Sequence, residues 1–194
     1  MTRVVDRGAI TAAFVGVGMA VTMAIGLLLI IPIDPAYILL AVPAGMVIGY
    51  YANARSSRSR GQWRRILPNG LFAGAVTGMS LAALLLGTKA LFFFGDTGYP
   101  NFNRVDSTGV AVGPTCAAGA DCVYRRYLAV EPDQLARAGV TDPASFAGVY
   151  WEAQWSSARL LVASTTGAAL VGAFLFGIAG PRKAPVPARS VATA

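Results

Sequence analysis

The sequence predicts an all-α integral membrane protein with four transmembrane helices and a roughly 60-residue extracytoplasmic loop between the third and the fourth. Of the 194 residues, 55% are hydrophobic and only 13% are charged, whereas an average soluble domain has about 25% charged residues. The hydrophobic residues are gathered into long runs, and the mean hydropathy of the chain is +0.57. Composition and clustering together favour a bilayer over water as the surroundings of most of the chain.

The charged residues indicate how the chain lies in the membrane. Sixteen Lys and Arg stand against nine Asp and Glu, which gives a formal net charge of +7. Much of the excess lies in short segments beside the apolar runs, where the positive-inside rule explains it without nucleic acid as a partner. We expect a bacterial plasma membrane protein with cytoplasmic N- and C-termini. The bacterial assignment follows from abundant Arg, Ala, Gly and Val, a composition typical of GC-rich genomes.

Histidine is absent from the sequence. It is the usual axial ligand of haem, a common metal ligand and the usual general base near neutral pH. The sequence therefore argues against a haem or copper centre held by His and against a Ser-His hydrolase. No cofactor bound through His is expected.

The first predicted span covers 9–33, after a cytoplasmic leader at 1–8. Its run of about 25 uncharged residues exceeds the 7–15 apolar residues of a signal peptide. The second predicted span, 36–52, is short for a crossing at about 17 residues. Charge decides in favour of a crossing, because otherwise the basic leader and the arginine-rich segment after 36–52 would lie on opposite sides of the membrane.

Residues 53–68 form a predicted basic cytoplasmic loop. The loop contains five arginines and no acidic residue, which is a strong topological signal. The same loop would suit a docking surface for anionic lipid or for an acidic partner, and both interpretations stay open. The arginines are Arg55, Arg58, Arg60, Arg64 and Arg65.

The third predicted span, 69–94, is the segment around which the others are arranged. Its 26 residues make about 39 Å of helix, enough for a hydrocarbon core of about 30 Å. Glycines recur in it at every fourth position, and the other spans carry similar faces, so helices can approach closely. These contacts can lie within the chain or be made with other subunits. The predicted packing glycines are Gly16, Gly45, Gly49, Gly70, Gly74, Gly78, Gly167 and Gly172.

Residues 95–155 form the predicted extracytoplasmic loop domain, which contains both cysteines. Small and turn-forming residues separate Cys116 from Cys122, so closure into a disulfide is geometrically easy. A zinc site is a poor alternative because two thiols lack the further ligands that zinc needs. A short helix is expected over 132–139, which has an acidic start and ends at a glycine.

A single long helix is predicted from Pro143 to Ala179. Asp142 can cap its start, and proline is favoured at the first helical position. Residues 156–179 of this helix form the fourth predicted span, and a cytoplasmic tail follows at 180–194. The part of the helix before the span is expected to project from the membrane and to present three residues to the loop domain, namely Phe146, Tyr150 and Ala153.

Two basic residues lie inside the outer ends of predicted spans, Lys89 and Arg159. Each can extend its side chain to the membrane surface, or it can form an intramembrane ion pair with an acid at similar depth. The acids nearest in depth are Asp34 and Glu152, and both interpretations stay open.

The leading functional hypothesis is a non-catalytic structural or accessory subunit of a larger membrane complex, with an energy-transducing complex as the favoured setting. It rests on the packing faces and the external loop, on spans without carboxylates, and on the lack of a nucleophile–base set or metal cluster in the sequence. The bilayer and other membrane subunits are the expected partners, and the chain is not expected to be an enzyme. One alternative is a small oligomeric transporter or channel. The other is a membrane enzyme that uses external acids, for which the candidates are Asp96, Asp106, Asp121 and Glu131.

Calcium binding is a weak interpretation of the polar cluster that follows the third span. Its oxygen-bearing residues do not fit the regular calcium-loop spacing, and turn formation explains them better. They are Asp96, Asn101, Asn103 and Asp106.

Overall fold

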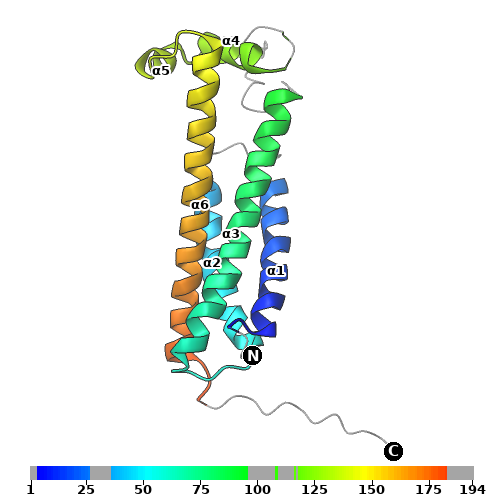
Figure 1. Ribbon diagram of the computed structural model, residues 1–194, viewed down its shortest axis with the longest axis vertical. Helices are drawn as coiled ribbons and strands as arrows, with labels where there is room; N and C mark the ends of the chain where they lie inside the picture. The colour runs from blue at the N-terminus through cyan, green and yellow to red at the C-terminus, as the bar shows by residue number, and fades with distance from the viewer. Residues whose placement is uncertain (1–3, 27–35, 96–107, 109–115, 117, 183–194) are drawn as a thin grey trace, which may run out of the picture. The chain divides into compact units, whose positions relative to one another are not determined.

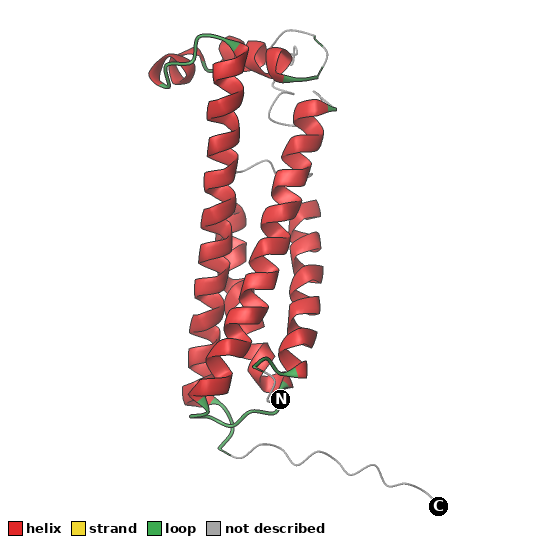
Figure 2. Ribbon diagram, in the orientation of Figure 1, coloured by secondary structure: helices red, strands yellow, loops and turns green. Residues whose placement is uncertain are grey.

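A computed structural model of the protein describes residues 4–26, 36–95, 108, 116 and 118–182. Figure 2 shows that these residues form helices joined by loops, and no strand occurs among them, which confirms the all-helical class. In chain order the helices are α1 (Arg7–Met23), α2 (Ala36–Arg55), α3 (Trp63–Phe94), α4 (Ala120–Val130), α5 (Pro132–Arg137) and α6 (Pro143–Ala179), labelled in Figure 1.

Three helical segments are long and apolar enough to cross a membrane, namely Arg7–Gly26, Trp63–Phe94 and Pro143–Ala179. A chain with three such helices is a multi-pass membrane protein in the coarse sense that the sequence predicted. Helix α2 is 20 residues long and contains Pro43. It is not among the three.

The connection between α2 and α3 differs from the prediction. Helix α2 continues to Arg55 and α3 begins at Trp63, so the expected loop 53–68 shrinks to 56–62. Pro68 lies inside α3 instead of ending the loop. Because it lies beyond the first turn, it removes one helical hydrogen bond, the one that an N–H at this position would have donated to the carbonyl of Arg64. Arg64 is an exposed residue.

The structure divides into two compact units. Unit 1 comprises Met1–Met19, Ile38–Gly78 and Ala163–Ala194, and unit 2 comprises Ala20–Tyr37 and Met79–Val162. Helices α1, α2, α3 and α6 each contribute residues to both units.

Unit 1 has a core built mainly from small residues. Parts of α1, α2, α3 and α6 run side by side in it (Figure 1). Lipid tails are as apolar as the side chains, so no hydrophobic force drives helices together in lipid. Their association then depends largely on close packing, and small side chains let the backbones pack closely. One buried cluster consists of Ala9, Ala12, Ile48, Ala52 and Ala73.

Unit 2 has a core of large side chains. Phe93 at the end of α3 packs with Val123 of α4, Leu135 of α5, and Phe146 and Tyr150 of α6. The ring centroids of Phe93 and Tyr150 are 5.0 Å apart, within the range of favourable aromatic pairs. This aromatic core holds the short helices α4 and α5 against the start of α6.

Helix α4 is the element that the sequence analysis missed. Ala120, Val123, Tyr124 and Tyr127 pack into the core, and their spacing of i, i+3, i+4 and i+7 is that of an amphipathic helix. The pattern was therefore present in the sequence. The short helix expected over 132–139 is confirmed as α5.

The long helix α6 has the predicted bounds, but one of its expected contacts is wrong. Phe146 and Tyr150 face the aromatic core as predicted, whereas Ala153 is exposed. The physical reason is that α4 and α5 cover only the first part of α6, since the α6 residues packed in this core extend no further than Trp151.

Candidate functional site

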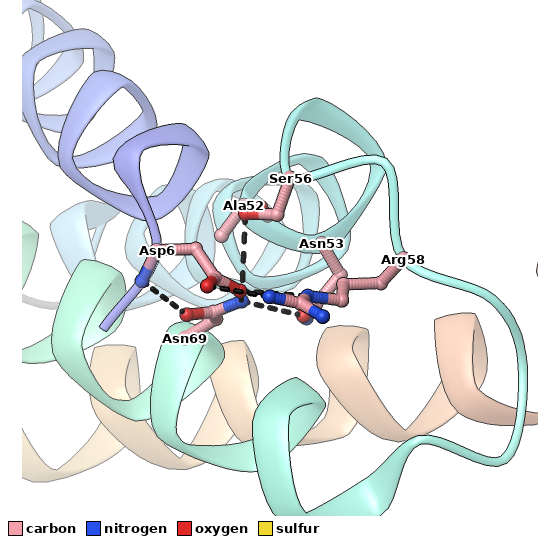
Figure 3. Close-up of polar contacts among 6 residues, drawn as sticks. All are labelled: Asp6, Ala52, Asn53, Ser56, Arg58 and Asn69. Atoms are coloured by element: carbon pink, nitrogen blue, oxygen red, sulfur yellow. Dashed lines mark hydrogen bonds and ion pairs between the residues drawn. The ribbon is translucent and has the colours of Figure 1, made fainter. Parts of the chain in front are cut away.

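Five polar residues from four segments meet in unit 1 beside the start of α1 (Figure 3). We call them the Asp6 cluster. Asp6 directly precedes α1, Asn53 lies in the last turn of α2, Ser56 and Arg58 lie in the loop that follows, and Asn69 lies in α3.

An ion pair joins the N-terminal segment to the loop between α2 and α3. Arg58 Nε donates to Asp6 Oδ2 at 2.8 Å, and Arg58 Nη2 donates to Asp6 Oδ1 at 2.6 Å. This two-bond geometry is the strongest form of an arginine–carboxylate contact. The side chains of Arg58 and Asp6 are only 28% and 16% exposed, so water screens the pair less than it would on an open surface.

Asn69 joins the same aspartate to α3. Its Nδ2 donates to Asp6 Oδ2 at 2.7 Å, and its Oδ1 accepts a hydrogen bond from the backbone N–H of Asp6 at 3.1 Å. Asn53 joins the end of α2 to α3, because its Nδ2 donates to the carbonyl oxygens of Gly49 in α2 and Ile66 in α3, both at 3.1 Å. Asn53 and Asn69 are fully buried, so the ends of α2 and α3 are held together from inside.

The surroundings of Asp6 lower its pKa. Partial burial is the largest single influence and acts in the opposite direction, since it disfavours the charged carboxylate. The hydrogen bonds from Arg58 and Asn69 and the positive charges of Arg58 and Arg65 together outweigh burial. The pKa of Asp6 therefore lies below its ordinary value of 3.8.

The Asp6 cluster is arranged for holding segments together. Both carboxylate oxygens of Asp6 accept hydrogen bonds from Arg58, which stays protonated in proteins. A carboxylate with this lowered pKa is a weak general base. The backbone carbonyl of Asp6 also accepts from the N–H groups of Ala9 and Ile10, so the residue ties down the first turn of α1.

The sequence analysis did not single out Asp6, Asn53 or Asn69. A usable signal was present, because asparagines at the ends of apolar helical runs form hydrogen bonds between membrane helices. The pairing itself was not visible, since Asp6 is separated by 52 residues from Arg58 and by 63 from Asn69.

The structure brings several of the singled-out glycines against neighbouring helices of unit 1. A β-carbon at Gly49 would overlap the carbonyl oxygen of Ala169, and one at Gly172 would overlap that of Met46. Helices α2 and α6 thus touch through their backbones. A β-carbon at Gly45 would lie 2.5 Å from the carbonyl oxygen of another α6 residue, Thr165.

Helix α3 makes similar contacts in unit 1. β-Carbons at Gly70 and Gly74 would crowd Ala173 and Ala169 of α6, and one at Gly16 of α1 would crowd the hydroxyl of Thr77 in α3. Gly78 is buried in α3. Gly167 is different, because a β-carbon there would meet nothing within 4 Å.

The five loop arginines do not share one environment. Arg55, Arg60 and Arg64 are exposed, and Arg65 is half-buried. Arg58 is the arginine bound by Asp6.

The candidate intramembrane charges are only partly brought together. Arg159 Nη2 donates to Glu152 Oε1 at 2.9 Å, and both side chains are exposed. Lys89 is covered by the rest of the chain, with 4% of its surface exposed; extension to the membrane surface and intramembrane pairing both stay predictions. Asp34 lies outside the described residues.

Cys116 and Cys122 are joined by the predicted disulfide, with their Cα atoms 5.5 Å apart. The part of the chain that the structure describes contains no group of three or more His, Cys, Asp or Glu residues that could hold a metal ion. The residues weighed for calcium lie outside that part, and they are Asp96, Asn101, Asn103 and Asp106.

Comparisons of the chain with protein-family models, with curated proteins and with solved structures found no match. The function therefore has to be inferred from the contacts within this chain.

Proposed function

We propose that this chain is a non-catalytic accessory subunit of a larger membrane complex, with an energy-transducing complex as the favoured setting. The observation that carries the proposal is the aromatic core that fixes α4 and α5 to the start of α6. A rigid module attached to a membrane-crossing helix suits the docking of another protein, because little conformational entropy is lost on binding.

The topology belongs to the same proposal. Helices α1, α2, α3 and α6 cross a bacterial plasma membrane, both termini are cytoplasmic, and residues 95–155 are extracytoplasmic. The arginines of the loop between α2 and α3 support the cytoplasmic side for that loop. The disulfide between Cys116 and Cys122 supports the opposite, oxidising side for unit 2 residues around α4.

The surface of the module offers apolar contacts. Leu128 of α4 is 47% exposed and Val149 of α6 is 44% exposed, although each is the sequence neighbour of a tyrosine that packs in the aromatic core. An apolar side chain on a rigid support outside the membrane is a suitable contact for a partner subunit.

The two alternatives have weaker support. A pore needs free polar groups along a helix. The hydroxyls of Thr11, Thr77 and Thr88 donate to carbonyls of their own helices, whereas the hydroxyl of Thr166 is buried without a hydrogen bond to the described residues. The enzyme alternative rests on external acids, of which Asp96 and Asp106 lie outside the described residues. Asp121 and Glu131 lie at opposite ends of α4, roughly 15 Å apart at 1.5 Å per residue, and Asp121 is paired with Arg125.

Site-specific photo-crosslinking in intact cells tests the proposal. A photoreactive residue at Leu128 is expected to give an adduct with one distinct membrane polypeptide, while the same residue at Phe14, an exposed position of α1, serves as the comparison. In the same cells, the cysteine of the variant Ser57→Cys should react with a thiol reagent only from the cytoplasm, and that of Ser145→Cys only from outside.

The outcomes separate the hypotheses. Adducts only with a second copy of this chain would favour the oligomeric transporter or channel. No adduct from Leu128 or from a second module position, Val149, would refute the subunit role. Labelling of Ser57 and Ser145 from the same side would refute the topology.

A further inference from the structure

The charged residues of unit 1 are almost all of one sign. Its described residues include seven arginines and a single acid, Asp6. All of these charges lie at or near helix ends. They are at or just before the first residue of α1, at or near the ends of α2 and α3, or after the end of α6. The arginines are Arg7, Arg55, Arg58, Arg60, Arg64, Arg65 and Arg182.

Backbone contacts gather these segments at one end of unit 1. The N–H of Arg60 donates to the carbonyl of Pro181 at 3.0 Å, and the N–H of Gly61 donates to the carbonyl of Gly177 at 3.0 Å. The loop therefore lies against the end of α6, next to Arg182. The bond between Arg58 and Asp6 brings the start of α1 to the same loop.

The single acid does not neutralise this surface, because its carboxylate forms an ion pair with Arg58 and one acid cannot balance seven arginines. Five other arginines of this end are exposed. We call them the basic end, and they are Arg7, Arg55, Arg60, Arg64 and Arg182.

Trp63 relates the basic end to the membrane surface. Its ring packs against Gly177 and lies 5.3 Å, centroid to centroid, from the ring of Phe174 in α6. Tryptophan at the end of a membrane-crossing helix is typical of the headgroup level. Arg64 follows Trp63 directly, so its guanidinium is in reach of lipid phosphates.

We propose that the basic end of unit 1 binds the headgroups of anionic phospholipids. Guanidinium groups bind phosphate through two parallel hydrogen bonds, and the negative surface of a cytoplasmic leaflet attracts each basic residue beside it. Among the loop arginines, Arg58 is outside this surface because its donors are directed to Asp6. The proposal rests on the proposed topology, which places this end at the cytoplasmic leaflet, and does not depend on the identity of any partner subunit.

The test uses the full chain, purified in a neutral detergent and titrated with phosphatidylglycerol or phosphatidylcholine, with bound lipids counted by native mass spectrometry. The variant R55Q/R60Q/R64Q removes three exposed arginines of the basic end. The matched control R125Q/R137Q/R159Q removes three exposed arginines of unit 2. At about fivefold per arginine, the first variant should bind phosphatidylglycerol roughly 100-fold more weakly, and the control should bind like the wild type.

A charge-conserving variant separates lipid binding from folding. R55K/R60K/R64K should retain most phosphatidylglycerol binding, because lysine also contacts phosphate as a point charge. The proposal is overturned if the glutamine variant binds like the wild type, if lysine and glutamine variants are equally weak, or if phosphatidylcholine binds as well as phosphatidylglycerol. Displacement of the lipid by equimolar soluble polyglutamate would also overturn it and would indicate an acidic protein surface as the ligand.

Discussion

The two units of this protein differ in the kind of packing that stabilises the interior of each. In unit 1, backbones touch because side chains are missing, as where Gly49 meets the carbonyl of Ala169. In unit 2, rings fill the interior, as where Phe146 packs against Tyr127 with centroids 5.2 Å apart. In unit 1 the lack of side chains lets backbones touch, whereas in unit 2 the burial of large side chains stabilises the interior.

The proposed topology accounts for the difference. Between helices in lipid, burial of a large apolar side chain gains little, because lipid tails solvate it equally well. The aromatic core of unit 2 lies outside the membrane in that topology, where burial of a ring removes a large apolar area from water. The two units should therefore be sensitive to opposite changes in side-chain size: adding a methyl destabilises unit 1, and removing a ring destabilises unit 2.

The largest effect is expected from Phe146→Ala in unit 2. Phe146 is only 3% exposed, and truncating a buried phenylalanine costs about 3–5 kcal/mol. Limited proteolysis should cut the variant in the region of α4 and α5 much faster than the wild type. Val149→Ala, on the exposed side of the same helix, is the control and should change the cleavage rate little. Equal rates for Phe146→Ala and the wild type would mean that the aromatic core does not hold these helices.

A smaller loss is expected from Gly49→Ala in unit 1. The added methyl would overlap the carbonyl oxygen of Ala169, and such overpacking costs about 1–3 kcal/mol. Unfolding of the purified chain in mixed micelles with increasing SDS measures the change. Gly167→Ala is the matched control, because a β-carbon there meets nothing within 4 Å. If both variants unfold at the same SDS fraction as the wild type, close backbone contact is not what stabilises unit 1.

The smallest effect concerns the Asp6 cluster of unit 1 and depends on pH. The pKa of Asp6 is lower in the folded chain than in the unfolded chain, so the unfolded chain takes up a proton first as the pH falls. The stabilisation is therefore complete well above the ordinary pKa of 3.8 and disappears as the pH falls through the lower, folded value.

Asp6→Asn measures this contribution, which we expect to be about 1.5 kcal/mol at neutral pH, at the lower end for hydrogen bonds to charged groups. The free-energy difference between wild type and variant should be constant from pH 7 to 5 and should shrink towards pH 3. Asp133→Asn, in the exposed first turn of α5, should show no comparable change. A difference that grows as the pH falls would contradict the assignment.

Elements with strong local signals were predictable from the sequence. The long helix α6 has the predicted bounds because Asp142 caps it, with its Oδ1 accepting from the N–H groups of Ala144 and Ser145 at 2.8 and 3.0 Å. The bridge between Cys116 and Cys122 was also local enough to predict.

Contacts between distant segments were not predictable in the same way. Nothing near Asp6 in the sequence points to Arg58 or Asn69, because the pairing is created by the packing of α1 against α2 and α3. The glycine spacing of the spans indicated close helix contact, but only the structure shows that Gly74 faces Ala169 of this same chain.

The Asp6 cluster also sets an order of events during synthesis. Asp6 leaves the ribosome before its partners exist, since Asn69 is made 63 residues later. At about 5–20 residues per second, this interval is roughly 3–13 s. During that time Asp6 lacks its hydrogen-bond partner on α3, so the start of α1 is made well before the residues that hold it.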